Sequence, residues 1–281
     1  MTGVQIICGL VILSLAATAA PAPRLKPLPG EAVEVEVAKG VKMTFCWIPE
    51  GKATLGSPSS EKCRSVEETE REFTTKGFWM GKYPVTQAEW EAVMGNNPSG
   101  FSKGGRFKEQ VAGVDTNRFP VDSVSWNDCQ DFLKKANQKW KMPAAMRQGR
   151  LALPHEDQWE YACRGGKGNE QPFYFGKELN GTLANVDGSN PYGARTTGPF
   201  LDRTSEVGRY ERAAPHPWRL CDMCGNVWQW CENIHEDWNE QRVLRGGSWY
   251  MPAAMARSAG RFRDLPDFRY FGNGFRVVVL P

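Results

Sequence analysis

The sequence predicts a loop-rich α+β domain that is built from short strands and a few short helices. Two observations come from the composition: the 281 residues include 11 tryptophans and 29 glycines, which suit an irregular backbone held by large aromatic side chains. The third is the local pattern, because only three segments carry helix-start signals, and none of them is long. With 41% hydrophobic residues, the chain can bury a sizeable core.

The first residues are predicted to be an export signal over residues 1–20. Residues 4–20 are apolar, and Ala17-Thr18-Ala19 fits a small-x-small cleavage site. The run is short for a membrane span, so no stable span is expected, although retention as an N-terminal anchor stays open. Residues 21–40 begin Pro-rich and are predicted to be a spacer, and the domain is expected over residues 41–281. The protein is therefore expected to be periplasmic, cell-surface or secreted.

Three helices are predicted from their N-terminal caps. In "PVTQAEWEAVMG", Thr86 and Glu89 have the spacing of a capping box, and in "VSWNDCQDFLKKAN", Ser125 and Asp128 repeat it. The third helix, "LPHEDQWEYACRGG", opens after Pro154 with acids in its first turn and stops at a Gly-Gly pair. Each of the three has apolar residues on one face, so each is expected to pack against the core.

Four strands are predicted between and after these helices, in "VKMTFCWIPEG", "FWMGKYPV", "NVWQW" and "GFRVVVL". The remaining chain is expected to be loop, including about forty residues from Gly166 to Arg209. A loop of that length in a compact domain is either functional or clamped by another part of the structure.

Eight cysteines occur in the chain, and Cys8 lies inside the predicted signal. In an exported protein some of the other seven are expected to pair, and the odd number leaves at least one thiol free or paired outside the chain. The spacing of Cys221, Cys224 and Cys231 could suggest zinc, but His216 and His235 lie outside the usual ligand spacings. Disulfides or buried thiols are the preferred interpretation.

Several classes of function are disfavoured by the residues present. Lys and Arg number 35 against 32 for Asp and Glu, without a basic stripe, so nucleic acid is not an expected partner. The three histidines lie in different motifs, and none has the spacing of a triad or of a metal pair. His155 is expected to cap the third helix, and Glu156, Asp157 and Glu160 to be first-turn acids rather than a catalytic pair.

Eight stretches resemble, in order, the formylglycine-generating enzyme family, also called sulfatase-modifying factor domains. They cover about Phe45 to Val279 and read "IPEGKATLGS", "GFWMGKYPVTQAEW", "FPVDSVSWNDCQDF", "LPHEDQWEYACRGG", "LANVDGSNPYG", "CDMCGNVWQWC", "RVLRGGSW" and "GFRVV". The resemblance implies the fold of this family, a variant of the C-type lectin fold.

The resemblance also implies an oxidase site, which this sequence does not reproduce. Oxidase members hold Cu(I) with a Cys-x4-Cys pair just after Gly-Gly-Ser and convert a substrate cysteine to formylglycine. Counted from Ser248, those two positions are Met251 and Ala256, and no cysteine follows Cys231. Copper and catalytic residues are therefore not expected. A formylglycine-generating oxidase with an altered site stays open as the alternative function.

Calcium is the metal that the resemblance implies instead. Family members commonly bind it at an Asp-x-x-Gly-Asn-x-x-Glu turn, which reads "DMCGNVWQ" here. The matching ligands are Asp222, the carbonyls of Gly225 and Val227, and the amide of Gln229. A second family site would use Asn185 and the Val186 carbonyl, with Asp202 as a candidate partner. The alternative is that Asp222 and Asn226 only hydrogen-bond a tight turn.

The irregular stretch between "RGGSW" and "GFR" is expected to be the functional face. It is too apolar for a solvated loop, and its mixture of Tyr, Phe and Arg is typical of binding hot spots, although part of it must be core. The candidate ligand-binding residues are Tyr250, Met251, Met255, Phe262, Arg263, Phe268, Tyr270 and Phe271.

A binding module for a protein or carbohydrate ligand is therefore the expected function. The stretch also resembles the variable segment in ligand-binding variable proteins of diversity-generating retroelements. Their adenine-directed variation of Asn codons cannot produce Met, so Met251 and Met255 count against this third possibility.

Overall fold

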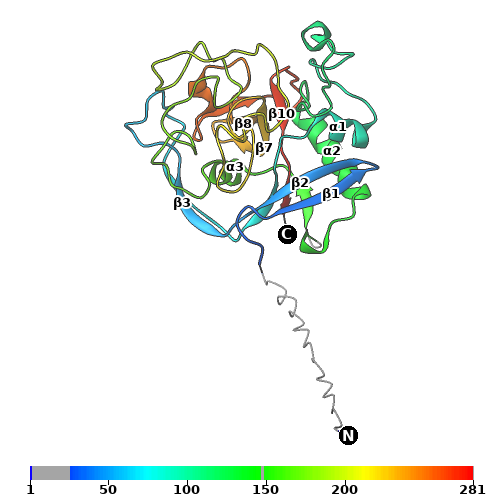
Figure 1. The fold of residues 1–281 in the computed structure, drawn as a ribbon. Helices are drawn as coiled ribbons and strands as arrows, with labels where there is room; N and C mark the ends of the chain where they lie inside the picture. The colour runs from blue at the N-terminus through cyan, green and yellow to red at the C-terminus, as the bar shows by residue number, and fades with distance from the viewer. Residues whose placement is uncertain (2–25, 147–148, 281) are drawn as a thin grey trace.

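The computed structural model describes residue 1, residues 26–146 and residues 149–280 (Figure 1). The predicted export signal therefore lies outside the described residues apart from Met1. Within the described ranges, no helix is long and apolar enough to cross a membrane.

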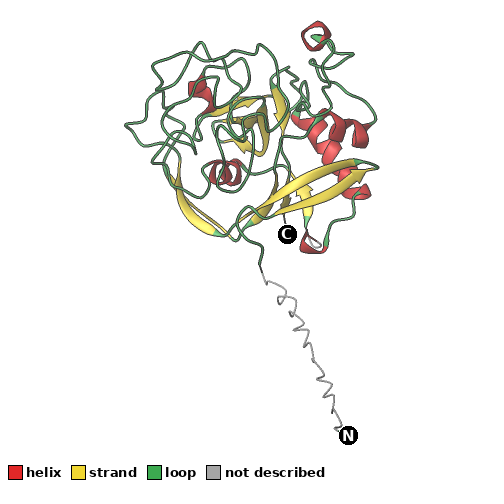
Figure 2. Ribbon diagram, in the orientation of Figure 1, coloured by secondary structure: helices red, strands yellow, loops and turns green. Residues whose placement is uncertain are grey.

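Two sheets and one hairpin make up the strand framework, and loops form most of the rest (Figure 2). The five-stranded sheet has the order β1 (Ala32–Ala38), β2 (Val41–Ile48), β5 (Phe78–Gly81), β11 (Val278–Leu280), β6 (Arg150–Ala152). The four-stranded sheet has the order β10 (Asn273–Phe275), β7 (Trp228–His235), β8 (Trp238–Arg245), β9 (Arg261–Asp264). The hairpin consists of β3 (Gly51–Leu55) and β4 (Arg71–Thr75). The predicted α+β class, rich in loops and short elements, is confirmed.

The three predicted helices are present as α1 (Gln87–Met94), α2 (Trp126–Lys139) and α3 (Glu156–Cys163). Short 3-10 turns lie at Lys108–Val111, Ala144–Met146 and Ala253–Ala256. Both predicted capping boxes form: Thr86 with Glu89 at α1, and Ser125 with Asp128 at α2. At α3, His155 takes the cap position, where its Nδ1 accepts a hydrogen bond of 3.2 Å from the Asp157 backbone N–H. These local signals therefore located all three helices.

Aromatic side chains fill the core between α1, α2 and the two sheets. Phe275 is fully buried, and its ring lies 5.2 Å from that of Phe132 on α2 and 6.0 Å from that of Trp90 on α1. A second cluster surrounds α3, where Trp159 and Cys163 are fully buried. Phe275 follows directly on the stretch proposed as a face, so that stretch is anchored to the main core.

The predicted spacer is wrong in its second half. Residues 32–38 form β1, which pairs antiparallel with β2, and Val35 and Val37 point into the core. The alternation of valine and glutamate in "AVEVEVA" is the period of a half-buried strand. The domain therefore begins by Ala32, and β3, β4, β8 and β9 likewise lie in stretches predicted to be loop.

A side chain from α2 closes the outer edge of the five-stranded sheet. The Asn137 amide accepts a hydrogen bond of 2.8 Å from the Leu151 backbone N–H and donates one of 2.9 Å to the Leu151 carbonyl. Both backbone groups that edge strand β6 presents at Leu151 are therefore already paired.

Candidate functional site

The Arg-Gly-Gly-Ser turn directs the chain from β8 into the predicted face. Gly246 and Gly247 have φ values of 97° and 74°, a region that residues with a Cβ rarely adopt. A Cβ on Gly247 would also lie 3.0 Å from Cα of Ala256. The missing side chain at Gly247 therefore lets the 3-10 turn Ala253–Ala256 pack directly against this glycine.

Several rings of the predicted face form one contiguous group. The ring of Tyr250 lies 5.7 Å from that of Tyr270 and 5.6 Å from that of Phe271. Phe268 stacks on Tyr270 at 6.0 Å and is 43% exposed. Beneath them, buried Trp249 contacts Tyr250 at 5.1 Å. The outer rings of this group are available to a ligand, whereas Trp249 is core.

Phe262 on β9 extends this group across the four-stranded sheet. It is 39% exposed and stacks on buried Trp228 with ring centroids 5.5 Å apart. The Trp228 backbone N–H donates a hydrogen bond of 2.7 Å to the Gly272 carbonyl, and the Tyr250 ring packs against Gly272. We call Tyr250, Phe262, Phe268, Tyr270 and Phe271 the aromatic face.

Two buried polar atoms beneath the aromatic face are unpaired. Neither the Trp228 indole Nε1 nor the Ser248 hydroxyl has a hydrogen-bond partner among the described residues, and both side chains are almost fully buried. Buried polar groups are normally satisfied. The predicted residues Met251 and Met255 are half-buried and pack against the same cluster as Trp228.

One predicted member, Arg263, points away from the aromatic face. Alternate residues of a strand face opposite sides, so Arg263 lies on the side of the sheet opposite Phe262. There it pairs with Glu67 at 3.1 Å and stacks over the ring of Trp238. Asp264 instead shares the side of Phe262, and neither it nor Asp267 forms an ion pair within the described ranges.

The two positions matched to the copper ligands do not fit copper. Met251 is half-buried, and Ala256 is fully buried in the 3-10 turn behind Gly247. A single thioether beside a methyl group cannot replace the two thiolates that hold Cu(I).

At the "DMCGNVWQ" turn, where the sequence predicted calcium, the structure places the buried guanidinium of Arg276 against Gln229. Gln229 Oε1 accepts hydrogen bonds of 2.9 Å from the Trp159 indole and from Arg276, which occupy both of its lone pairs. The Arg276 guanidinium also donates to the carbonyls of Gly81 and Lys82. Burial lowers the pKa of Arg276 to about 10, so the group remains charged at neutral pH. Gln229, as placed, does not fit as a calcium ligand.

The second predicted calcium site, at Asn185, contains buried oxygens without hydrogen-bond partners among the described residues. The Asn185 side-chain NH2 donates a hydrogen bond of 3.0 Å to the Arg203 backbone carbonyl. The Asn185 backbone carbonyl accepts one of 2.8 Å from the Asn226 backbone N–H. Asn185 Oδ1 and Thr204 Oγ1 are buried and lack hydrogen-bond partners in the described part of the chain. Both are hard oxygens of the kind that calcium prefers.

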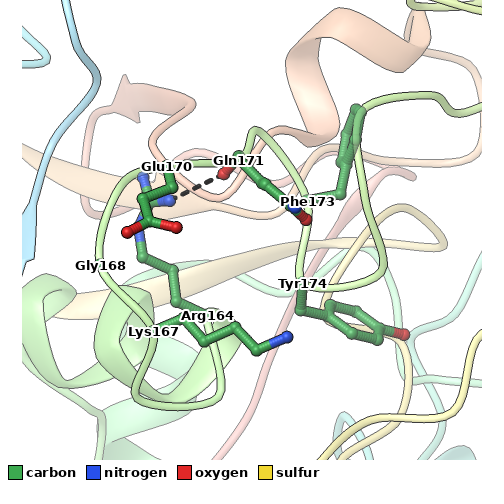
Figure 3. A pocket seen from close by; sticks show the side chains of 7 residues that line it. All are labelled: Arg164, Lys167, Gly168, Glu170, Gln171, Phe173 and Tyr174. Atoms are coloured by element: carbon green, nitrogen blue, oxygen red, sulfur yellow. Dashed lines mark hydrogen bonds between the residues drawn. The ribbon is translucent and has the colours of Figure 1, made fainter.

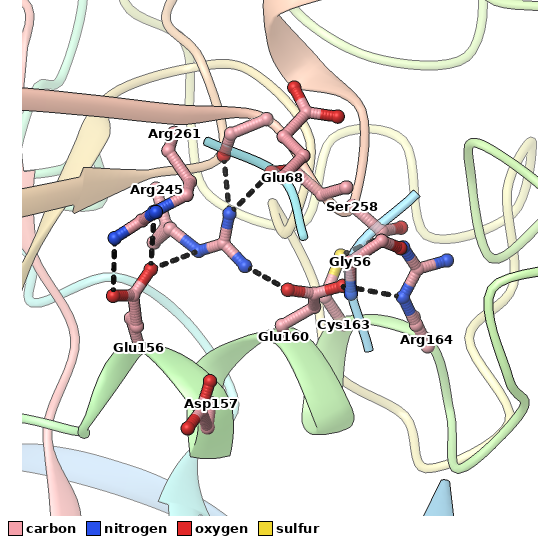
Figure 4. Close-up of polar contacts among 12 residues, drawn as sticks. Gly56, Glu68, Glu156, Asp157, Glu160, Cys163, Arg164, Arg245, Ser258 and Arg261 are labelled. Atoms are coloured by element: carbon pink, nitrogen blue, oxygen red, sulfur yellow. Dashed lines mark hydrogen bonds and ion pairs between the residues drawn. The ribbon is translucent and has the colours of Figure 1, made fainter. Parts of the chain in front are cut away.

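A network of buried ion pairs on α3 was not predicted. Glu160 is 1% exposed, accepts from Arg164 at 2.9 Å and from the Gly56 N–H at 2.8 Å, and pairs with Arg245 (Figure 4). Burial favours a raised pKa for Glu160, but the charges of Arg245 and Arg164 outweigh it and the pKa is lowered. The expectation that Glu160 is a first-turn acid is therefore wrong. The Glu160 and Arg164 spacing, four residues apart on a helix, was the available signal.

A small cavity opens in the loop after α3, away from the aromatic face. Its volume is about 180 Å³, and Arg164 crosses it to donate 3.0 Å to the Gln171 carbonyl (Figure 3). Its lining residues are Arg164, Lys167, Gly168, Glu170, Gln171, Phe173 and Tyr174. Because the Arg164 hydrogen bonds are all made within the protein, we assign no function to this cavity.

The seven cysteines of the described domain are all free, and only Cys63 is exposed. Over the described residues, no group of three or more His, Cys, Asp or Glu side chains is arranged to hold a metal ion.

The family profile described as "Sulfatase-modifying factor enzyme 1-like domain" matches residues 32–280. The chain belongs to this family. The formylglycine-generating-enzyme-type fold that the sequence motifs implied is thereby confirmed. The profile starts where β1 starts, which agrees with the corrected domain boundary.

Two curated relatives and one solved structure are similar to this chain, and their names record different roles. "Chaperone protein LppX" of Paenibacillus barcinonensis is 29% identical over 71% of this chain and 76% of its own. "Inactive C-alpha-formylglycine-generating enzyme 2" of Bos taurus is 31% identical over 72% of this chain, which spans 58% of that relative. Treponema denticola variable protein 1 superposes with a TM-score of 0.69 at 23% identity, covering 89% of this chain and 99% of its own. That likeness is one of fold.

Proposed function

We propose that this protein is an exported recognition module that binds a polypeptide through the aromatic face. The observation that carries the proposal is the contiguous, partly exposed row of rings. Binding hot spots concentrate aromatic side chains, and exposed aromatic rings gain free energy when a ligand covers them.

A polypeptide suits this arrangement for two reasons. Its apolar side chains can pack against the partly exposed rings of Phe262 and Phe268. Its basic side chains can offset Asp264 and Asp267, which lack a cationic partner among the described residues. Burial and the charge of Asp267 raise the pKa of Asp264, as expected for a carboxylate that is not neutralised. The relative named as a chaperone, and the one named as inactive, are in keeping with binding without oxidation.

Single alanine variants on the aromatic face test this proposal. Peptides selected from a random library on the wild-type protein serve as the probe, with fluorescence anisotropy as the readout. Phe268→Ala and Phe262→Ala should weaken peptide binding about thirtyfold, roughly 2 kcal/mol. Both should leave the free energy of unfolding within about 1 kcal/mol of wild type, since each ring is partly exposed.

Trp238→Ala is the matched control for these variants. Trp238 is 51% exposed on the hairpin between β7 and β8, beside Arg263 and away from the aromatic face. It should bind the peptides like wild type. Equal loss in Trp238→Ala, binding of glycans instead of peptides on an array, or conversion of a cysteine peptide to formylglycine with added copper would each contradict the proposal.

We also propose that calcium binds at the Asn185 and Thr204 oxygens as a structural ion. Calcium binding only to the folded state should add about 2.7 kcal/mol to the free energy of unfolding at a hundredfold excess over its Kd, and should therefore raise the melting temperature. Thr204→Val keeps the shape but removes the hydroxyl, so it should abolish the calcium-dependent shift in differential scanning calorimetry. A wild-type melting temperature that does not change in millimolar calcium would exclude this site.

A further inference from the structure

Two buried thiols meet at the C-terminal end of α3. Cys163 is the last residue of α3, and its Sγ lies 3.9 Å from the carbonyl oxygen of Met223, the residue before Cys224. Cys224 follows Met223 directly in the chain, and the Cys163 and Cys224 thiols are close enough to change each other's pKa. Both belong to the same core cluster and are at most 4% exposed.

The chain between these cysteines is the long loop that the sequence analysis expected to be functional or clamped. From Cys163 to Met223 the separation is 60 residues, and the structure contains neither helix nor strand between α3 and β7. Turns, isolated β-bridges such as the one between Leu179 and Tyr192, and side-chain contacts hold this segment in place. A covalent link across its base would restrict the unfolded chain far more than the folded one.

Several groups of the fold surround the Cys163 sulfur. Burial favours a raised pKa, but hydrogen bonds with Cys224 and Ser258 and the charges of Arg164 and Arg245 outweigh it, so the pKa of Cys163 is lowered. Ser258 Oγ lies 3.5 Å from the sulfur (Figure 4). The pKa of Cys224 is raised, first by its hydrogen bond with Cys163 and then by burial.

We propose that Cys163 and Cys224 form an intramolecular disulfide that closes the base of the 164–223 loop. The oxidant is a disulfide donor, such as oxidised glutathione, acting before the two sulfurs are enclosed by the core. One thiol attacks the donor to form a mixed disulfide and release one glutathione. The second thiol then displaces the other glutathione, so the two cysteines lose two electrons and two protons and the donor becomes two thiols.

A second pair of cysteines is the competitor that the experiment must separate. Cys46 and Cys221 each lie 3.9 Å from the same Arg219 carbonyl oxygen. In the folded protein, burial raises the pKa of both of these thiols. Cys63, the exposed thiol, has no such neighbour among the described cysteines.

Peptide mapping of the whole protein tests the proposal. The protein is refolded in a glutathione buffer, its free thiols are blocked with N-ethylmaleimide in denaturant, and it is digested without reductant. The expected result is a peptide containing Cys163 joined to one containing Cys224, lighter by two hydrogen atoms than the reduced pair. Folded protein in which both residues carry N-ethylmaleimide, or in which Cys221 is linked to Cys46 or Cys163, would overturn the proposal.

Thermal unfolding of matched variants provides the second measurement. Oxidised wild type should melt about 10 °C above protein held in reductant, given the length of the closed loop. Cys224→Ser should lose this difference, whereas Cys63→Ser should keep both the linked peptide and the difference. A linked pair in wild type without any effect of reductant on the melting temperature would contradict the clamping role.

Discussion

Replacing Arg245 by methionine is expected to lower the free energy of unfolding by about 3 to 5 kcal/mol, because it removes one partner from a buried ion network. Arg245 is fully buried, pairs with Glu160, and donates at 2.8 Å and 2.7 Å to the carbonyls of Ala259 and Gly260. The variant leaves these carbonyls without their donor and removes a counter-charge from Glu160. Urea denaturation of the purified variant measures the loss.

An exposed ion pair provides the control for this variant. Arg269 pairs with Asp128 at 2.6 Å, but its side chain is 55% exposed, so Arg269→Met should change the free energy of unfolding by less than about 1 kcal/mol. The double variant Arg245→Met, Glu160→Met should be less destabilised than the sum of its single variants, since neither charge is left alone. Equal effects of Arg245→Met and Arg269→Met would contradict the structural role of the network.

Phe275→Ala is expected to destabilise the fold by about 3 to 5 kcal/mol through the cavity that it leaves. Its ring is fully buried against Phe132 and Trp90, and it follows the aromatic face in the chain. Chemical denaturation should place Phe275→Ala well below wild type, with poor expression as a second sign. Phe268→Ala is the matched comparison, because its ring is partly exposed. If both variants unfold alike, the stretch between Trp249 and Phe275 is core throughout, and the recognition proposal loses its main support.

Local features of this fold could be predicted from the sequence, and distant pairings could not. The capping boxes at Thr86 and Ser125 depend on residues three positions apart, so the sequence contains the whole signal. Strand β1 had an equally local signal in its alternating valines, which its position beside a Pro-rich stretch obscured. The Arg245 and Glu160 pair spans 85 residues, and nothing in either motif identifies the other as its partner.

The candidate site shows the same division. The aromatic face was predicted from its composition, but only the strand register shows that Phe262 and Arg263 lie on opposite sides of the sheet. Trp228 was predicted within a strand and not as a site residue, because its unpaired indole depends on groups brought from elsewhere in the chain. Gln229 matched a calcium motif, yet Arg276, 47 residues away, occupies its oxygen. Sequence motifs therefore identified the candidate positions. Tertiary contacts determine which way each side chain points and whether its polar atoms are already hydrogen-bonded.

The hydrogen bonds of Asn137 bear on how the protein behaves when many copies are close together. An outer strand with free backbone groups is a template on which a second chain can add, and repeated addition leads to ordered aggregates. At Leu151 the amide of Asn137 takes both of these groups, so a strand from a neighbouring molecule finds no donor or acceptor there. One side chain of helix α2 thus limits growth of the sheet between molecules at this point, a task separate from holding the domain together.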